Sequence, residues 1–271
     1  MTEVHLAVPV FEVTGTDDPR LSDYRNIPDP DLLRSRGLFI AEGRQVVRRL
    51  LAAARFRVRS LLLTPAARAG LADLLLHAAD VPVFLVSQAA MNAIAGFNIH
   101  RGCLAAGERP APARWEDLAA AARRLVVLEG VGNADNVGGI FRNAAAFGAD
   151  AVLLGPSCAD PLYRKAIRTS MGAALQVPFA SMEDWPGDLS RLKALGFGLW
   201  ALTPSSDARL LRHADPPARL AWLVGHEGEG LSQIALSHAD ARVRIQMAEG
   251  IDSLNVATAV AIALYEIGRP G

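Results

Sequence analysis

Three short segments of the chain combine polar side chains with glycines in patterns that suit ligand binding. The first, LEGVGNADNVGGIFRNAAAFGA (128–149), passes from an apolar strand through a loop into a helix that stops at Gly148. A helix start attracts anions, because its first backbone N–H groups lack partners within the helix. Asn136 and Arg142 lie near the first turns of this helix. Taken alone, capping by Asn136 and a surface ion pair of Arg142 explain the motif equally well.

Two common phosphate-binding fingerprints fail in this segment. A G-x-G-x-x-G motif would need a third glycine at Asp135, after Gly130 and Gly132. The Gly-Lys-Ser/Thr sequence of a phosphate loop does not occur in the chain. A dinucleotide-dependent oxidoreductase is therefore the least favoured of the functions considered.

The second segment, LVGHEGEGLS (223–232), is a strand followed by a loop with three glycines and then a helix. Glycines let a backbone approach a ligand closely or adopt a positive φ. Glu227 within this loop could bind a ribose hydroxyl or form an ion pair with an arginine. His226 could equally well have no functional role. Many strand-to-helix turns are rich in glycine, so this signal alone is moderate.

The third segment, RIQMAEGIDSLNVATAVAIALYE (244–266), ends a strand, turns at Gly250 and opens a strongly apolar helix with Ser253 and Asn255. The simplest interpretation of this segment alone is that Ser253 caps the helix and Asn255 is exposed.

The elements that position these segments form a repeating pattern of strands and helices. Near-continuous apolar strands between helices predict a parallel sheet covered on both faces. Because each segment follows a strand of this sheet, we expect the three loops to build one pocket at its edge. The expected strands are 125–129, 151–155, 177–181, 197–203, 220–225 and 242–247, with helices at about 137–147, 162–174 and 188–195, a short one from 231 and a last one from 253.

The chain divides into residues 1–107, a linker at 108–114 with two prolines, and residues 115–271. The first part predicts a small α/β domain, with a helix over 41–54, a strand at 59–64, a helix at about 66–79 and a strand at 81–86.

Arginines are concentrated in the first part, although the whole chain carries no net charge. Residues 34–68 hold nine arginines and one acid, Glu42. Arg44, Arg48 and Arg55 share one face of the helix over 41–54. The face is either ordinary solvated surface or an RNA contact, and we favour RNA because like charges repel one another unless an anion is present.

Composition excludes several classes of protein. Hydrophobic residues make up 51% and charged residues 21% of the chain, as in ordinary globular proteins. No apolar run is long enough to span a bilayer, and the N-terminus does not read as a secretory signal. Cys103 and Cys158, with no nearby histidine at metal-ligand spacing, support neither a disulfide framework nor a zinc site. We therefore expect a cytoplasmic protein without a membrane or metal partner.

Together, the three segments resemble the SpoU or TrmH group of RNA ribose methyltransferases in the SPOUT superfamily. The resemblance covers 125–267, and FIAEGRQVV (39–47) resembles the start of a substrate-binding domain common in this family. This chain has Ile245-Gln246-Met247 and Arg142-Asn143-Ala144 where the family usually has Ile-Pro-Met and Arg-Thr-Ala. The match rests on Asn136 to Gly148, Gly225-x-Glu227-x-x-Gly230-Leu231, and Ser253-Leu254-Asn255-Val256.

This resemblance implies an α/β protein whose C-terminal, trefoil-knotted methyltransferase domain follows a small α/β domain that binds the RNA substrate. It implies a homodimer that uses S-adenosyl-L-methionine to methylate a ribose 2′-hydroxyl of structured rRNA or tRNA. Arg142 would engage the hydroxyl, with Asn136, Glu227, Ser253 and Asn255 shaping the site. The cofactor would contact Leu202, Thr203, Gly225, Glu227, Gly230, Ile245, Met247 and Leu254. The RNA would contact Arg44, Arg48 and Arg55.

A non-catalytic RNA-binding protein on the same scaffold is the main alternative. Such a protein would be expected to lack polar groups in one or more motifs. All five polar residues of the motifs are present here: Asn136, Arg142, Glu227, Ser253 and Asn255. The sequence leaves open whether the substrate is rRNA or tRNA, which nucleotide is modified and whether the protein confers antibiotic resistance.

Overall fold

A computed structural model describes residues 8–25, 28–78, 80–96, 98–99 and 102–268. The chain forms two compact units. Unit 1 comprises residues 1–111 and 162–175, and unit 2 comprises residues 112–161 and 176–271. The segment 162–175, which the sequence suggested would belong to the second domain, thus packs with the first.

Unit 1 is built on a mixed sheet with the strand order β1-β4-β3-β5-β2. β1, β4 and β3 run parallel, whereas β5 is antiparallel to both of its neighbours. Its elements are β1 (Val10–Glu12), η1 (Pro19–Tyr24), α1 (Asp29–Arg36), β2 (Leu38–Glu42), α2 (Arg44–Ala52), β3 (Val58–Leu63), α3 (Pro65–Ala69), α4 (Ala72–Leu75), β4 (Val83–Leu85), α5 (Gln88–Ala95) and β5 (Cys103–Glu108).

Two sequence expectations for unit 1 were wrong. The helix expected over 41–54 begins only at Arg44, because residues up to Glu42 pair with β5 and Gly43 turns the chain at a φ of 94°. The helix expected over 66–79 is broken at Gly70 into α3 and α4. Glycine is a poor helix former, and the Arg44 guanidinium fills the space in which a Gly70 side chain would lie.

The segment 162–175 contributes α8 (Arg164–Thr169) and η2 (Ala173–Leu175) to unit 1. The Arg164 backbone N–H donates to Asp29 Oδ2 over 2.8 Å. Arg49 Nη1 donates to the Met171 carbonyl over 2.6 Å. The segment is therefore tied to both α1 and α2.

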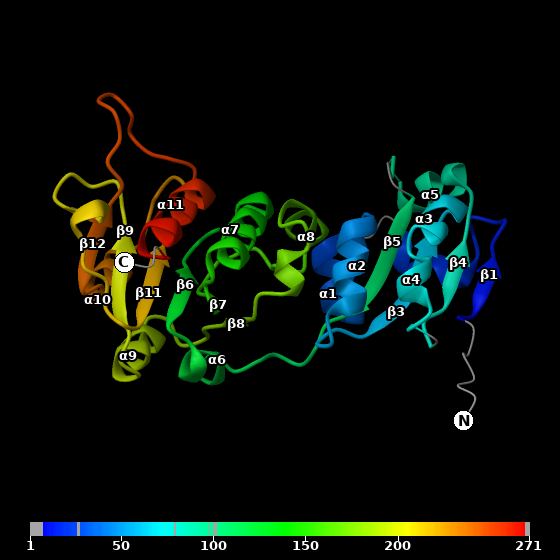
Figure 1. The fold of residues 1–271 in the computed structure, drawn as a ribbon, viewed down its shortest axis with the longest axis horizontal. Coiled ribbons are helices and arrows are strands. Elements are labelled where there is room, and N and C mark those ends of the chain that lie inside the picture. Colours follow the sequence, from blue (N-terminus) through cyan, green and yellow to red (C-terminus); the bar gives the residue numbers. More distant parts are fainter. Residues whose placement is uncertain (1–7, 26–27, 79, 97, 100–101, 269–271) are drawn as a thin grey trace. The chain divides into compact units, whose positions relative to one another are not determined.

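Unit 2 is a sheet with the strand order β10-β12-β9-β11-β6-β7-β8, in which every neighbouring pair of described strands is parallel (Figure 1). The predicted parallel α/β sheet is confirmed; the trefoil knot stays a prediction. The elements are α6 (Trp115–Ala121), β6 (Arg124–Leu128), α7 (Ala134–Phe147), β7 (Ala151–Leu154), β8 (Phe179–Ser181), α9 (Gly187–Ala194), β9 (Gly198–Leu202), β10 (Arg209–Leu210), η3 (Leu211–His213), β11 (Leu220–Val224), α10 (Gln233–His238), β12 (Ala241–Arg244) and α11 (Val256–Gly268).

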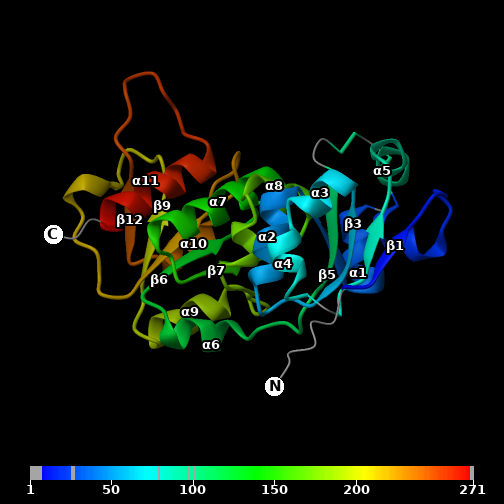
Figure 2. The ribbon, with the colours of Figure 1, turned by 45° about the vertical axis from the view of Figure 1, so that its right-hand side comes forward.

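Helices cover both faces of this sheet. On one face, alternate strand residues such as Leu125, Leu153 and Leu223 pack with Leu189 of α9 and Ala235 of α10. Side chains one position along each strand point to the other face. There α7 and α11 lie side by side, away from α6 and α9 (Figure 2).

α7 and α11 approach closely because small residues face each other. A Cβ atom on Gly139 would lie only 2.8 Å from the Cβ atom of Ala257. Asn143 Nδ2 donates to the Ala257 carbonyl over 2.7 Å. These contacts set the position of the start of α11 against the middle of α7.

Within the described ranges, no helix is long and apolar enough to cross a membrane. The same residues hold no group of three or more histidine, cysteine or acidic side chains that could bind a metal ion. Burial raises the pKa of Cys103 to about 12, so this thiol stays protonated near neutral pH.

Candidate active site

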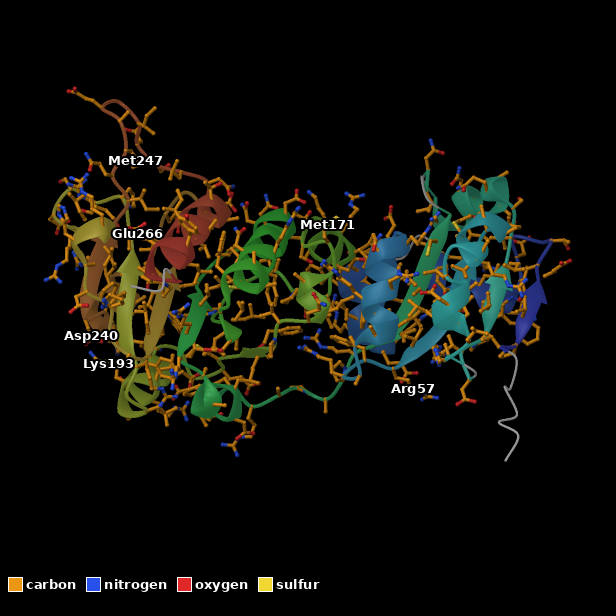
Figure 3. The ribbon with its side chains drawn as sticks, in the orientation of Figure 1. Arg57, Met171, Lys193, Asp240, Met247 and Glu266 are labelled. Carbon is orange, nitrogen blue, oxygen red and sulfur yellow. The ribbon has the colours of Figure 1, made fainter. Side chains whose placement is uncertain are left out.

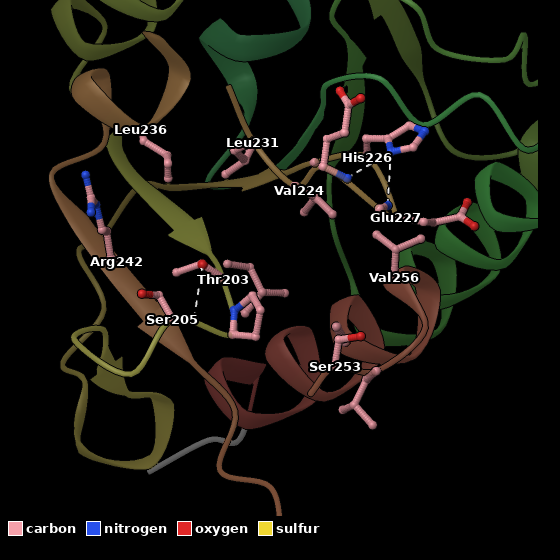
Figure 4. Close-up of a pocket in the computed structure, with 18 of the residues that line it drawn as sticks. Thr203, Ser205, Val224, His226, Glu227, Leu231, Leu236, Arg242, Ser253 and Val256 are labelled. Atoms are coloured by element: carbon pink, nitrogen blue, oxygen red, sulfur yellow. Dashed lines mark hydrogen bonds between the residues drawn. The ribbon is translucent and has the colours of Figure 1, made fainter. Parts of the chain in front are cut away.

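A cavity of about 490 Å³ opens at the edge of the unit 2 sheet, where the loops after β9, β11 and β12 meet (Figure 4). This is the carboxyl edge of the parallel strands, where ligands of open α/β sheets bind. It is lined by Leu202, Thr203, Pro204, Ser205, Val224, Gly225, His226, Glu227, Gly228, Glu229, Gly230, Leu231, Gln233, Leu236, Arg242, Ile245, Met247, Ser253, Leu254, Val256 and Ala259.

The residues predicted to hold the cofactor all line this cavity: Leu202, Thr203, Gly225, Glu227, Gly230, Ile245, Met247 and Leu254. Ser253 also lines it, whereas Asn136, Arg142 and Asn255 are not among the lining residues. Met247 lies at the base of the loop that follows β12 (Figure 3).

Asn136 links the three predicted motifs by hydrogen bonds. Its Nδ2 donates to Oε1 of Glu227 in the loop 225–231, which we call the glycine loop. Its Oδ1 accepts from Nδ2 of Asn255, at 2.8 Å. Residues separated by 91 and 119 positions along the chain thus form one continuous chain of side chains, which we call the amide relay.

The orientation of both amides in the relay is fixed from its two ends. Asn255 Oδ1 accepts the backbone N–H groups of Ala257 and Thr258 at 3.0 and 3.3 Å. The Asn255 amide must therefore turn its Nδ2 toward Asn136. At the other end, Glu227 Oε1 accepts from Asn136, so Asn136 presents its own Nδ2 there. Both constraints demand the same arrangement.

The helix caps differ from the simple expectations. Asn133, rather than Asn136, caps α7, with its side chain accepting from the Asp135 backbone N–H. Asn136 lies within the first turn and is only 7% exposed. Asn255, rather than Ser253, caps α11. The predicted C-cap is confirmed, because Gly148 has a φ of 74° and its N–H binds the Ala144 carbonyl.

The glycine loop folds back on itself. A Cβ atom on Gly225 would lie 2.2 Å from the Gly230 carbonyl carbon, so only glycine fits there. Gly230 has a φ of 72°, which side chains rarely tolerate. His226 stabilises the turn of this loop, because its Nδ1 accepts the backbone N–H groups of Gly228 and Glu229 at 3.0 and 3.2 Å.

Arg142 lies on the solvent side of α7 and is exposed. No hydrogen bond or ion pair of its side chain involves the residues that the structure describes. Its guanidinium is therefore available to an external anion, and the structure does not bring it into the amide relay.

Charged groups lie unevenly around the cavity. Glu227 and Glu229 supply two carboxylates on the glycine loop. Arg242 on β12 supplies a cation whose Nη1 lies 3.7 Å from Asp207 Oδ2. A ligand that carries both a positive centre and an anionic group would find partners for each.

Sequence reasoning missed several residues that shape the cavity. Ser205, Gln233 and Arg242 line it without belonging to any motif. Gly139, which the motifs did not single out, and Asn143, which stood out only as a departure from the family's Arg-Thr-Ala, set the position of α11. A Gly-Gly pair inside a helix was the available signal for Gly139, since glycine there costs stability unless close packing requires it.

Arginines of the arginine-rich segment 34–68 of unit 1 form ion pairs with acids of the same protein. Acids outside the segment pair with five of its nine arginines in the described structure. The pairs are Arg34–Asp31, Arg36–Asp23, Arg48–Asp73, Arg57–Glu108 and Arg59–Asp23, and Arg57 is labelled in Figure 3. The repulsion argument for an RNA partner therefore loses much of its force.

The three arginines predicted to contact RNA have different surroundings. Arg48 Nη1 donates to Asp73 Oδ1 over 2.9 Å and lowers the pKa of that carboxyl. The Arg55 guanidinium lies over the Phe56 ring, 4.6 Å from its centroid, and burial lowers the pKa of Arg55. Arg44 is exposed beside Gly70. Of the three, Arg44 is the most accessible to a phosphate.

Comparisons with known proteins agree with the resemblance seen in the motifs. The profile of the SpoU rRNA Methylase family matches residues 123–265. An uncharacterized tRNA/rRNA methyltransferase of Mycobacterium bovis is 46% identical over 269 residues, which cover 97% of this chain and 93% of that protein.

Two further comparisons extend this relationship. The 23S rRNA (guanosine-2′-O-)-methyltransferase RlmB of Xanthomonas campestris is 31% identical over 198 residues, covering 70% of this chain and 78% of RlmB. The AdoMet-bound rRNA methyltransferase of Sinorhizobium meliloti shares the fold, with a TM-score of 0.81, 24% identity, and coverage of 95% of this chain and 97% of that one. By its family profile and its near full-length relatives, the chain belongs to the SpoU rRNA methylase family.

Proposed function

We propose that this protein transfers a methyl group from S-adenosyl-L-methionine to a ribose 2′-hydroxyl of a structured RNA, either rRNA or tRNA. The observation that carries the proposal is the amide relay of Asn255, Asn136 and Glu227, which joins the three family motifs beside one cavity. Family membership and the name of the RlmB relative support methyl transfer to a ribose 2′-oxygen.

The cavity suits S-adenosyl-L-methionine in size and chemistry. Its volume of about 490 Å³ falls within the range of small-molecule sites. Apolar side chains such as Leu202, Ile245 and Leu254 offer a surface for the adenine ring. Glu227 and Glu229 suit the positive charges of the sulfonium and ammonium groups.

When bound, this cofactor supplies a methyl group on a positively charged sulfur, open to in-line attack by the ribose oxygen. The side chains of the protein must then hold the hydroxyl in line and assist the loss of its proton. The amide relay fixes the Glu227 carboxylate through Asn136, and Ser253 lines the same cavity. We expect the ribose to bind beside these groups.

Arg142 is proposed as the residue that engages the RNA at the reacting nucleotide. A guanidinium keeps its proton in proteins, so it is a poor general base. Its planar fork instead suits a phosphate, and its charge would polarise an adjacent hydroxyl. Its exposure is consistent with this role, because its partner would come from the RNA.

The experiment that tests this function is methyl transfer by an Arg142→Ala variant, compared with wild type and with Lys193→Ala. Lys193 is a control cation in unit 2 that pairs with Asp240 over 2.6 Å (Figure 3). We expect Arg142→Ala to abolish methylation of rRNA or tRNA, measured by mass spectrometry of nucleosides, while calorimetry still shows cofactor binding. Near-normal turnover would contradict the role of Arg142.

The same experiment separates the main alternative. A non-catalytic RNA-binding protein would bind RNA without producing 2′-O-methylated nucleosides in the wild type. Mapping 2′-O-methylation in cells with and without the protein would then identify the modified nucleotide.

We also propose that the protein is a cytoplasmic homodimer, as the family resemblance implies. The aromatic pair of Phe147 and Tyr265, with Tyr265 half exposed on α11, offers an apolar surface that association could cover. Size-exclusion chromatography with light scattering tests this, and a monomer at micromolar concentration would contradict it.

A further inference from the structure

Glu129 is a nearly buried carboxylate that the proposed chemistry does not use. It follows β6, is 9% exposed and does not line the cavity. Its Oε1 accepts from Trp185 Nε1 at 2.9 Å and from Ser232 Oγ at 2.7 Å. Its Oε2 accepts the Ser232 backbone N–H at 2.8 Å. Three donors thus converge on one carboxylate, an arrangement that requires a group able only to accept.

These contacts hold the two ends of the glycine loop together. The backbone N–H of Glu129 donates to the carbonyl of Val224, the residue before the loop, at 2.9 Å. The Glu129 carboxylate binds Ser232, the residue after Leu231 and the N-cap of α10. One residue therefore contacts both sides of the glycine loop, which forms one wall of the cavity.

Trp185 connects the same carboxylate to the neighbouring strands. Its ring packs where a Gly155 side chain would lie, since a Cβ atom there would be 3.0 Å from the ring. Gly155 follows β7, and Trp185 follows β8. The Glu129 contacts thus join the ends of four adjacent strands, β11, β6, β7 and β8, at the edge that carries the cavity.

We propose that Glu129 is a positioning residue that fixes the glycine loop in the shape that binds the methyl donor. The inference rests on the proposed function for the identity of the ligand. Glu129 acts through Val224 and Ser232 on the loop and touches no reacting atom. Its loss should weaken cofactor binding more than it slows the chemical step.

Glu129→Gln tests the inference with almost no change in shape. The glutamine amide keeps one acceptor oxygen and replaces the other with a donor, so at least one of the converging N–H groups then meets a donor. We expect the Kd for S-adenosyl-L-methionine, measured by calorimetry, to rise about tenfold, the factor that corresponds to losing one hydrogen bond to a charged group. The kcat at saturating cofactor should fall by less than the Kd rises.

Asp150→Asn is the matched control, because it alters a carboxylate that precedes β7 and binds the opposite end of β6 from Glu129. Asp150 Oδ2 accepts the backbone N–H groups of Arg123 and Arg124, each at 2.8 Å. This variant should leave the Kd unchanged even if it lowers the melting temperature. Trp185→Phe, which removes one donor and keeps a ring, should weaken binding less than Glu129→Gln.

Hydrogen exchange without cofactor provides a readout that does not depend on activity. We expect Glu129→Gln to speed exchange of the amides in 225–232, and Asp150→Asn to leave them unchanged. An unchanged Kd in Glu129→Gln, or equal effects of the two variants on Kd and on exchange in the loop, would overturn the inference. Failure of the wild-type chain to bind the cofactor would instead contradict the proposed function, and loop exchange would still report on Glu129.

Discussion

Folding brings the glycine-rich motifs of unit 2 together, whereas it pairs the arginines of the arginine-rich segment of unit 1 with separate acids. In unit 2, Asn136 and Asn255 are separated by 119 positions in the sequence and form a hydrogen bond. In unit 1, arginines that are close in the sequence turn to different acids, such as Asp31, Asp73 and Glu108.

This difference shows which kinds of sequence pattern report on a site. Loops at the ends of parallel strands meet because the sheet forces them to the same edge. A count of charges along a segment includes only the charges within it, whereas the folded chain brings acids from elsewhere. The motif pattern therefore carries more functional information than the charge pattern.

Of the variants that test this comparison, the one that separates α7 and α11 should have the largest effect. Gly139→Ala places a Cβ atom 2.8 Å from that of Ala257, and overpacking of this kind costs about 1–3 kcal/mol of stability. We expect the helices to move apart, the Asn136–Asn255 hydrogen bond to weaken and methyl transfer to fall more than tenfold. Urea unfolding and a methylation assay measure the two effects.

Ala257→Gly in the Gly139→Ala background is the control. It removes the opposing Cβ atom while Asn143 keeps its bond to the backbone carbonyl at position 257. Activity should recover in the double variant. If Gly139→Ala is fully active, close packing of the helices does not govern the site and the comparison fails in unit 2.

We expect a smaller effect, on RNA binding, from reversing the charge of arginines in unit 1. Arg44→Glu should weaken RNA binding more than Arg48→Glu, because Asp73 already neutralises Arg48. Removal of one cation that binds an RNA phosphate makes the plot of log K against log salt shallower by about 1. Binding measured over a salt series gives both quantities, with Lys193→Glu in unit 2 as the control. If reversing Arg44, Arg48 and Arg55 together changes neither, these arginines do not contact RNA.

The smallest effect concerns the pKa of Asp73. The hydrogen bond from Arg48 holds this pKa below its ordinary value. The pair therefore stabilises the fold above the ordinary pKa, and the contribution is lost as the pH falls through the lowered pKa. In Arg48→Ala, an NMR titration of the carboxyl should show the pKa returning upward, while that of Asp207, lowered by Ser205, stays the same. An unchanged Asp73 would mean that the pair does not persist in solution.

Much of unit 2 was predictable, because apolar strands and intervening helices have distinct periodicities. The expected strands at 125–129, 151–155 and 220–225 appear within one or two residues as β6, β7 and β11. Unit 1 was harder to predict. β2 and β5 pair with antiparallel partners far along the chain, and the break at Gly70 depends partly on where the Arg44 side chain lies.

The family, the parallel sheet and the polar residues of the three motifs were all predictable from the sequence, because these features depend on residue types at short spacings. The folded structure was needed to show which residues cap α7 and α11, how the amide relay is oriented and why Gly225 must be glycine. It also decided that most of the arginine-rich segment pairs with acids of the same protein. These outcomes depend on contacts between residues far apart along the chain, which no local pattern can specify.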